Sequence, residues 1–103
     1  MKTFKTIDCC EMLDKINDQE EYIIADIRDK LSFKNEHIDS AINLSNENMT
    51  KFISETEKHK SIVVYCYHGN SSKQVAQFLV NNGFEDVYSL NGGYELWRSL
   101  LLK

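Results

Sequence analysis

Two short apolar runs constrain the fold of this chain more than any other feature of its sequence. The run YIIADI spans residues 22–27 and the run SIVVYC spans residues 61–66, and both are rich in β-branched residues. Such compact runs are typical of strands that are buried on both faces of a sheet. Helical patterns separate most of the predicted strands, so strand and helix alternate along the chain. This order predicts a mainly parallel sheet with helices on both faces, which is a three-layer α/β domain.

The other elements are predicted from spacing and from capping residues. Strands are expected over 4–7, 41–44 and 86–90, and helices over 9–17, within 45–59, over 72–82 and over 94–102. Asp8 is a candidate N-cap of the first helix, Ser45 or Asn46 is one for the second, and Gly83 supplies a left-handed stop for the third. Residues 28–40 are expected to form a loop with one helical turn. The predicted apolar anchors are Met12, Leu13, Ile16, Leu31, Phe33, Ile38, Met49, Phe52, Ile53, Val75, Ala76, Phe78 and Leu79.

Length and charge limit the classes of partner. At 103 residues the chain has the size of one domain, which we expect to span residues 1–103. A net charge of −4 argues against nucleic acid as a partner, because binding phosphates requires a basic face. No apolar run approaches the length of a membrane-spanning helix, and the first residues lack the apolar core of a signal peptide. We therefore expect a cytoplasmic protein that binds neither nucleic acid nor a membrane.

The three cysteines do not form the pattern of a disulfide framework or a metal site. Adjacent Cys9 and Cys10 are poorly placed to bridge each other, and the sequence has no C-x-x-C pair. A helix start can lower a thiol pKa, but no loop motif surrounds Cys9 and Cys10, and we expect them to be bystanders. Cys66 differs from both, because it ends the most apolar predicted strand and opens the polar loop CYHGNSSK at 66–73.

The loop after Cys66 is suited to holding a thiolate. In parallel α/β sheets, ligands bind beyond the carboxyl ends of the strands. Where the backbone turns sharply from strand into helix, successive N–H groups converge with the positive end of the helix dipole. The groups expected to converge here are the N–H groups of Tyr67, His68, Gly69, Asn70, Ser71 and Ser72. A thiol at that point ionises more readily than a free one. The alternative is that Cys66 is simply a small buried apolar residue, and the loop composition favours the functional interpretation.

Three stretches of the chain together resemble the single-domain rhodaneses, a family of sulfurtransferases. CYHGNSSKQVAQFL is similar to their active-site loop, and NGGYELW is similar to their Gly-Gly-aromatic-x-x-Trp signature. ADIRDKLSFKNEHIDSAINL is similar to a third signature, in which Asp-x-Arg precedes an aromatic residue and then Gly-His-Ile with a small residue. Glu36 stands where the family has glycine before His37. Tyr67 and His68 stand where the larger tandem-domain rhodaneses carry Arg and Lys that grip thiosulfate.

The resemblance implies a fold and a mechanism. The implied fold is a rhodanese-like three-layer domain with a mainly parallel sheet of about five strands. In the implied mechanism, the Cys66 thiolate attacks the outer sulfur of thiosulfate, sulfite leaves, and a persulfide remains in the amide loop. Cyanide or a thiol acceptor, such as a thioredoxin-like dithiol protein, then takes the sulfur. The resemblance implies no metal and no organic cofactor.

Several residues are expected to support Cys66 within the binding loop of residues 67–73. Lys73 either attracts the substrate dianion or is a solvent-facing lysine. Ser71 and Ser72 either cap the following helix or donate hydroxyls to the anion. His68 could donate to substrate, but we expect it to be a mobile loop histidine without an ionic partner.

Structural support is expected from residues on the neighbouring loops. Asp26 and Arg28 share one face of a strand end, which favours an ion pair or backbone hydrogen bonds that brace the loops. His37 is expected to make a structural hydrogen bond. The resemblance adds Gly92, Gly93 and Trp97 to this group. Phe33, Leu90 and Trp97 either wall the site or belong to the core.

Three other functions compete with a thiosulfate sulfurtransferase. A cysteine phosphatase needs a longer loop with an arginine six positions after the cysteine, where this chain has Ser72. It also has Tyr65 where the histidine before the nucleophile would stand. A non-catalytic rhodanese-like binding module typically lacks the nucleophile, whereas Cys66 is present. A sulfur carrier loaded by a desulfurase has the same chemistry, and sequence does not separate it from an enzyme that uses thiosulfate.

Overall fold

Five parallel strands form a single sheet in the computed structural model, which describes residues 2–17 and 21–101. The strands lie in the order β1-β5-β4-β2-β3, and every neighbouring pair is parallel. Their bounds are β1 Lys5–Ile7, β2 Ile23–Asp26, β3 Ile42–Asn43, β4 Ser61–Tyr65 and β5 Asp86–Leu90. The parallel five-stranded sheet predicted from the alternation of elements is therefore confirmed. The order also places β4, the most apolar strand, at its centre.

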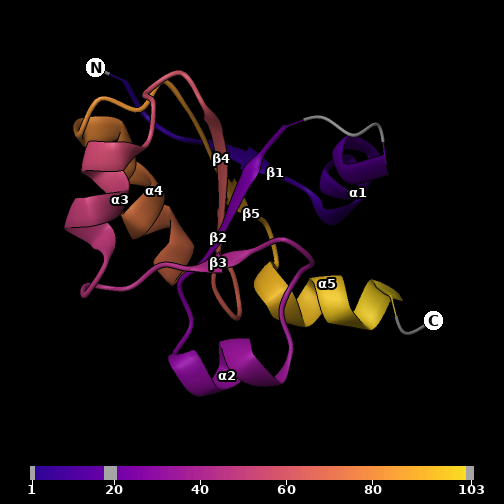
Figure 1. Cartoon of the computed structure of the whole chain (residues 1–103). Helices are drawn as coiled ribbons and strands as arrows, with labels where there is room; N and C mark the ends of the chain where they lie inside the picture. Colours follow the sequence, from indigo (N-terminus) through magenta and orange to yellow (C-terminus); the bar gives the residue numbers. More distant parts are fainter. Residues whose placement is uncertain (1, 18–20, 102–103) are drawn as a thin grey trace.

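Helices cover both faces of this sheet. Figure 1 shows α3 and α4 on one side, α1 and α5 on the other, and α2 beside the end of the sheet where β2 leaves it. The helix bounds are α1 Cys9–Asn17, α2 Lys30–Asn35, α3 Met49–Glu55, α4 Ser71–Asn81 and α5 Gly93–Leu101. None of the helices within residues 2–17 and 21–101 is long and apolar enough to cross a membrane. The three-layer arrangement agrees with the prediction.

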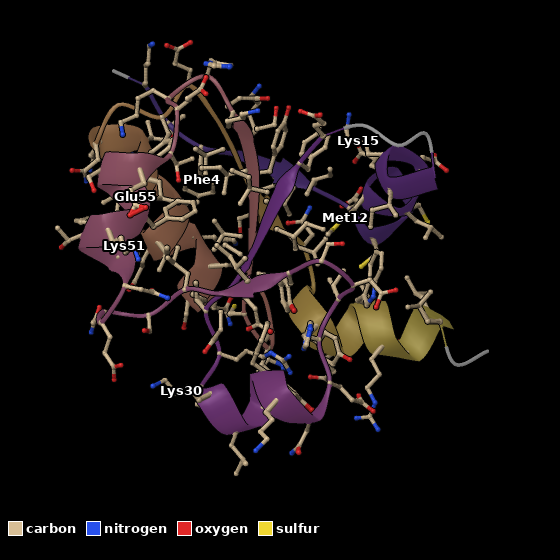
Figure 2. All side chains as sticks on the ribbon, viewed as in Figure 1. Phe4, Met12, Lys15, Lys30, Lys51 and Glu55 are labelled. Atoms are coloured by element: carbon tan, nitrogen blue, oxygen red, sulfur yellow. The ribbon has the colours of Figure 1, made fainter. Side chains whose placement is uncertain are left out.

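The two faces of β4 have separate cores because successive side chains of a strand point in opposite directions. Ile62 and Val64 pack with the residues of α4, and Val63 and Tyr65 pack with those of α1 and α5. Figure 2 labels one side chain of each core, Phe4 beside α3 and α4 and Met12 on α1. Both cores contain residues of β4, the strand that Cys66 directly follows.

Some predicted apolar anchors face solvent. Leu13 and Ile16 of α1, Phe78 of α4 and Leu31 of α2 are all more than one third exposed. In α4 the stripe instead continues to Val80, which is buried together with Ala76 and Leu79. The prediction was wrong at Leu13, Ile16 and Phe78 because helical spacing defines a broad stripe, whereas the packing partner covers only part of it. It was wrong at Leu31 because an isolated apolar residue in a polar segment does not by itself indicate burial.

Two local predictions also differ from the structure. The segment 28–40 contains the six-residue helix α2, begun by Asp29, whose carboxylate accepts a hydrogen bond from the Ser32 N–H at 3.2 Å. Helix α3 begins later than expected and has Asn48 as its N-cap residue, in place of Ser45 or Asn46. The predicted helix 9–17 and strand 86–90 are confirmed at both ends, and the remaining predicted elements differ by one residue at one or both ends. Residue 102 of the predicted last helix, like residues 1 and 103 of the predicted domain, lies outside the described residues.

Candidate active site

Cys66 lies immediately after β4, at the carboxyl end of the central strand. The loop of residues 66–70 joins this strand to α4, and only 6% of the Cys66 surface is exposed. Gly69 has a φ of +96°, in the left-handed region that glycine adopts without strain. This conformation turns the loop back over the sulfur, so that the chain from 69 to 72 passes close to Sγ.

Three hydrogen-bonding groups surround the Cys66 sulfur. The N–H groups of Gly69 and Ser72 donate to Sγ over 3.1 and 3.3 Å. The hydroxyl Oγ of Ser72 lies 3.4 Å from the same sulfur. The sequence predicted that six successive N–H groups would converge, whereas among the described residues those of Gly69 and Ser72 donate to Sγ and that of His68 adds a smaller stabilisation of the thiolate. Helix α4 begins at Ser71, so Ser72 donates from the first turn of the helix and Gly69 from the loop before it.

These contacts favour the thiolate. Burial raises the pKa of the Cys66 thiol, but hydrogen bonds from the Ser72 hydroxyl and from the backbone N–H groups of Ser72, Gly69 and His68 lower it. The net effect is a pKa below the ordinary value of a cysteine. Hydrogen bonds to the charged form stabilise that form, and the start of α4 adds its dipole to them. The loop therefore provides the environment of a nucleophilic cysteine.

Ser89 is part of the site although the sequence did not single it out. This residue of β5 is only 1% exposed, and its hydroxyl lies 2.8 Å from the Ser72 hydroxyl. The neighbouring strand thus holds Ser72 Oγ beside the sulfur. Sequence reasoning missed Ser89 because a serine within an apolar strand carries no local signal of the residue opposite it.

Removal of the Ser72 hydroxyl should make the thiol less acidic. We expect Ser72→Ala to raise the pKa of Cys66, so less thiolate is present at neutral pH. One hydrogen bond is worth about 1 kcal/mol, so alkylation by iodoacetamide at neutral pH should slow about five-fold. The rate profile between pH 5 and 10 should move to higher pH. Ser71→Ala, at an exposed position one residue earlier, is the control. An unchanged profile for Ser72→Ala would show that this hydroxyl does not stabilise the thiolate.

Helix α5 closes over the other side of the same loop. The N–H groups of Tyr94 and Glu95 donate to the carbonyl oxygens of Cys66 and Tyr67, at 2.8 and 3.0 Å. Gly93 has a φ of +61°, and a Cβ atom there would lie 2.6 Å from both of these carbonyl oxygens. Only a glycine at this position therefore allows α5 to pack this closely against the loop that follows Cys66. Gly92 also has a positive φ, and a Cβ atom there would meet the Leu96 side chain.

Comparison with known proteins places the chain in a family. The model of the rhodanese-like domain family matches residues 10–100. The chain belongs to the rhodanese-like family. It is 44% identical to a thiosulfate sulfurtransferase GlpE of Shewanella oneidensis over 94% of this chain and 95% of that protein. It is 47% identical to the protein of the same name from Pseudomonas syringae, over 75% of this chain and 73% of the relative.

Solved structures agree with this assignment. A rhodanese-like domain from Anabaena superposes with a TM-score of 0.84 at 26% identity, over 97% of this chain and 76% of that one. A rhodanese-related protein from Thermoplasma volcanium gives a TM-score of 0.79 at 24% identity, over 94% and 93% of the two chains. The family and the fold expected from the three sequence signatures are thus confirmed.

In this rhodanese, a buried ion pair braces the loops beside Cys66. The Asp26 carboxylate is fully buried and accepts hydrogen bonds from Arg28 Nε, from its terminal nitrogen at 2.7 Å and from its backbone N–H. The same guanidinium donates to the Glu36 carbonyl oxygen at 2.6 Å and lies 4.1 Å from the centre of the Tyr94 ring. Asp26 and Arg28, predicted to form an ion pair or backbone hydrogen bonds, form both and thereby connect the 28–36 segment with α5.

His68 has an ionic partner, contrary to the prediction from sequence. Its Nδ1 lies 2.6 Å from the carboxylate of Glu95, in the first turn of α5. The expectation of an unpaired loop histidine was wrong because nothing in the local sequence indicates that α5 returns to this loop. Lys73 is exposed in the first turn of α4, and Asn70 is the N-cap residue of that helix. The Asn70 side chain makes no capping hydrogen bond, and the Ser72 hydroxyl is directed to Cys66 rather than to a cap.

The remaining predicted support residues lie further from the sulfur. His37 Nδ1 is 2.6 Å from the Phe33 carbonyl oxygen, and the two rings stack with centroids 3.9 Å apart. Trp97 and Leu90 are buried in the core on the α1 and α5 side, and Phe33 packs against that core. These positions fit the core alternative better than a wall of the site.

The other two cysteines are separate from the site. Cys9 is buried in the core and Cys10 is exposed, and both are free thiols. Burial raises the pKa of Cys9, and the nearby Cys10 and Asp8 raise it further, so the helix start does not activate this thiol. Only Cys66 combines a strand end, amide donors and a lowered pKa among the three.

Proposed function

We propose that this rhodanese is a thiosulfate sulfurtransferase in which Cys66 carries the transferred sulfur as a persulfide. The observation that carries the proposal is the ring of donors around Cys66 Sγ, two backbone N–H groups at 3.1 and 3.3 Å and the Ser72 hydroxyl at 3.4 Å. The sulfurtransferase names of the relatives support it. We further propose that residues 1–103 act as one domain and that the protein works in the cytoplasm.

In the first step the Cys66 thiolate attacks the outer sulfur of thiosulfate. A new S–S bond forms at Cys66, the S–S bond of thiosulfate breaks, and sulfite leaves with the electron pair of that bond. The negative charge then rests on the outer sulfur of the persulfide. Donors that stabilise the thiolate are close enough to stabilise this anion, and they are fixed by the backbone before the reaction begins.

In the second step a nucleophile attacks the outer sulfur and the Cys66 thiolate leaves. Cyanide serves as this nucleophile in an assay and yields thiocyanate. A thiol or a dithiol protein of the thioredoxin type is the corresponding acceptor in the cell. Lys73, exposed in the first turn of α4, is proposed to raise the local concentration of anionic donors near the loop.

A phosphatase is a poorer fit to this site. Such an enzyme would need an arginine at position 72 to clamp phosphate with two hydrogen bonds. Position 72 is instead a fully buried serine, and its N–H and its hydroxyl both face the Cys66 sulfur. The short loop therefore directs its donors at one sulfur atom and lacks the arginine that would clamp a phosphate.

Steady-state turnover distinguishes an enzyme from a sulfur carrier. We expect the purified protein to produce thiocyanate from thiosulfate and cyanide over many turnovers, with saturation by both substrates. The measurement is the colorimetric determination of thiocyanate per mole of protein over time. A protein that loads from a persulfide donor but yields less than one thiocyanate per chain from thiosulfate would be a carrier, and the proposal would be wrong.

A further inference from the structure

A polar groove of about 310 Å³ lies beside the active-site loop. Its walls include Tyr67 of that loop, Glu36 after α2, and Tyr94 and Arg98 of α5, with Arg28 between them. The volume is at the lower end of the range for small-molecule sites, so it suits a ligand of a few heavy atoms rather than a large one. A small number of polar groups therefore determines which ligand the groove can bind.

The groove is next to the loop that carries the nucleophile. Tyr67 directly follows Cys66 in the chain, and the Tyr94 N–H donates to the Cys66 carbonyl oxygen at 2.8 Å. Both of these residues line the groove. A molecule held there is thus positioned at the loop that carries the persulfide.

The groove has one solvent-facing charge of each sign. Glu36 Oε2 lies 3.6 Å from Arg98 Nε, and the two side chains are 57% and 52% exposed. Arg28 adds no further free charge, because its guanidinium is 7% exposed and paired with the buried Asp26. The groove is therefore neutral overall but strongly dipolar, with an anionic and a cationic group side by side.

Both the backbone and the side chain of Glu36 are held in place. The Tyr94 hydroxyl donates to Glu36 Oε2 at 3.1 Å, and Arg28 donates to the Glu36 carbonyl oxygen at 2.6 Å. A positioned carboxylate beside an arginine matches an ammonium and a carboxylate that are carried on one carbon atom. This is also the position where the sequence departs from the family pattern of glycine before His37.

We infer that the groove binds the sulfur acceptor, and that this acceptor is a small zwitterionic thiol of the amino-acid type. Glu36 binds its ammonium group and Arg98 binds its carboxylate, in a groove whose wall includes Tyr67, the residue that follows Cys66. The inference rests on the proposed function, since it concerns the second step of the same reaction. It distinguishes a small thiol from a dithiol protein, which would not need the paired charges of this groove.

The transfer step is a displacement at sulfur. The acceptor loses its thiol proton to water, and its thiolate attacks the outer sulfur of the Cys66 persulfide. An S–S bond forms to the acceptor, the S–S bond to Cys66 breaks, and the electron pair of that bond returns to the Cys66 thiolate. The product is the acceptor persulfide, and no further oxidant or reductant takes part.

Three related thiols and two variants test the inference. The persulfide form, prepared with thiosulfate and desalted, is discharged with cysteine, with cysteamine, which lacks the carboxylate, or with N-acetylcysteine, which lacks the ammonium. Half-saturating concentrations are compared between wild type, Glu36→Gln and Arg98→Gln. Because each thiol is compared with itself across proteins, its intrinsic reactivity cancels. Glutamine at position 36 keeps an acceptor for the Tyr94 hydroxyl.

The expected result is a crossed pattern. Glu36→Gln raises the half-saturating concentration about five- to ten-fold for cysteine and cysteamine but leaves N-acetylcysteine unchanged, as for loss of one charge-assisted hydrogen bond. Arg98→Gln raises the half-saturating concentration for cysteine and N-acetylcysteine but not for cysteamine. Glu85→Gln is the matched control and changes none of the three, because this exposed acidic residue precedes the amino end of β5, at the opposite edge of the parallel sheet from the Cys66 loop.

The outcomes separate the inference from the proposed function. A persulfide that is discharged by cyanide, but by the three thiols without saturation or without the crossed pattern, overturns the zwitterion site alone. Saturation by a thioredoxin-type protein without any effect of the two variants would identify a protein acceptor in its place. Failure to form a persulfide with thiosulfate overturns both proposals.

Discussion

Replacement of Cys66 by serine abolishes thiocyanate production while the chain keeps its fold. A serine hydroxyl is not appreciably ionised near neutral pH and cannot carry a sulfane sulfur, so we expect a loss of about a thousand-fold or more. Stability should change little, because the oxygen can accept from the same Gly69 and Ser72 N–H groups that surround the sulfur. The measurements are thiocyanate production from thiosulfate and cyanide, and the urea unfolding midpoint.

Cys10→Ser is the matched control for this substitution. Cys10 is an exposed free thiol at the start of α1, outside the described contacts of Cys66. We expect this variant to retain wild-type activity. A Cys66→Ser protein that still turned over thiosulfate at a rate near wild type would rule out Cys66 as the sulfur carrier.

Replacement of Gly93 by alanine should be the most destabilising single-methyl change near the site. Its φ is +61°, and the new Cβ would lie 2.6 Å from the carbonyl oxygens of Cys66 and Tyr67. Left-handed strain and overpacking against backbone together should cost about 3 kcal/mol of unfolding free energy. Because the atoms that must move belong to the active-site loop, thiocyanate production should also fall in the fraction that remains folded.

The variant Gly83→Ala separates the cost of the left-handed backbone from the cost of overpacking. Gly83 also has a positive φ, of +100°, but the nearest atoms to a Cβ there belong to the Lys58 side chain, at 3.8 Å, which is an ordinary van der Waals contact. We expect it to cost about 1 kcal/mol, for the backbone conformation alone, and to leave activity unchanged. Equal losses of stability in the two variants, measured by urea unfolding, would contradict the close packing of α5 on the loop.

Contiguous features of the sequence predicted most of the fold. The apolar runs before Cys66 and Asp26 gave the positions of β4 and β2, because burial on both faces leaves a continuous signal. The sheet order β1-β5-β4-β2-β3 could not be predicted from such contiguous features. It depends on which strand each helix returns to, and helix length and polarity do not encode that choice.

The candidate site also has a part that the sequence could predict and a part that it could not. The loop from Cys66 to Ser72 could be predicted because the sulfur and its donors are within seven consecutive residues. Ser89 and Glu95 could not, because each reaches the loop from a separate element. The exposure of Phe78 was also mispredicted, since periodicity identifies a helix face but not how much of it the sheet covers.

The most direct test of the account is the intact mass of the purified protein after treatment with thiosulfate, before and after a cyanide chase. The account predicts a gain of one sulfur mass, located on Cys66 by fragmentation, that cyanide removes as thiocyanate. Protein with Cys66 reduced and accessible that gains no sulfur, or that gains sulfur on Cys9 or Cys10 instead, would contradict it.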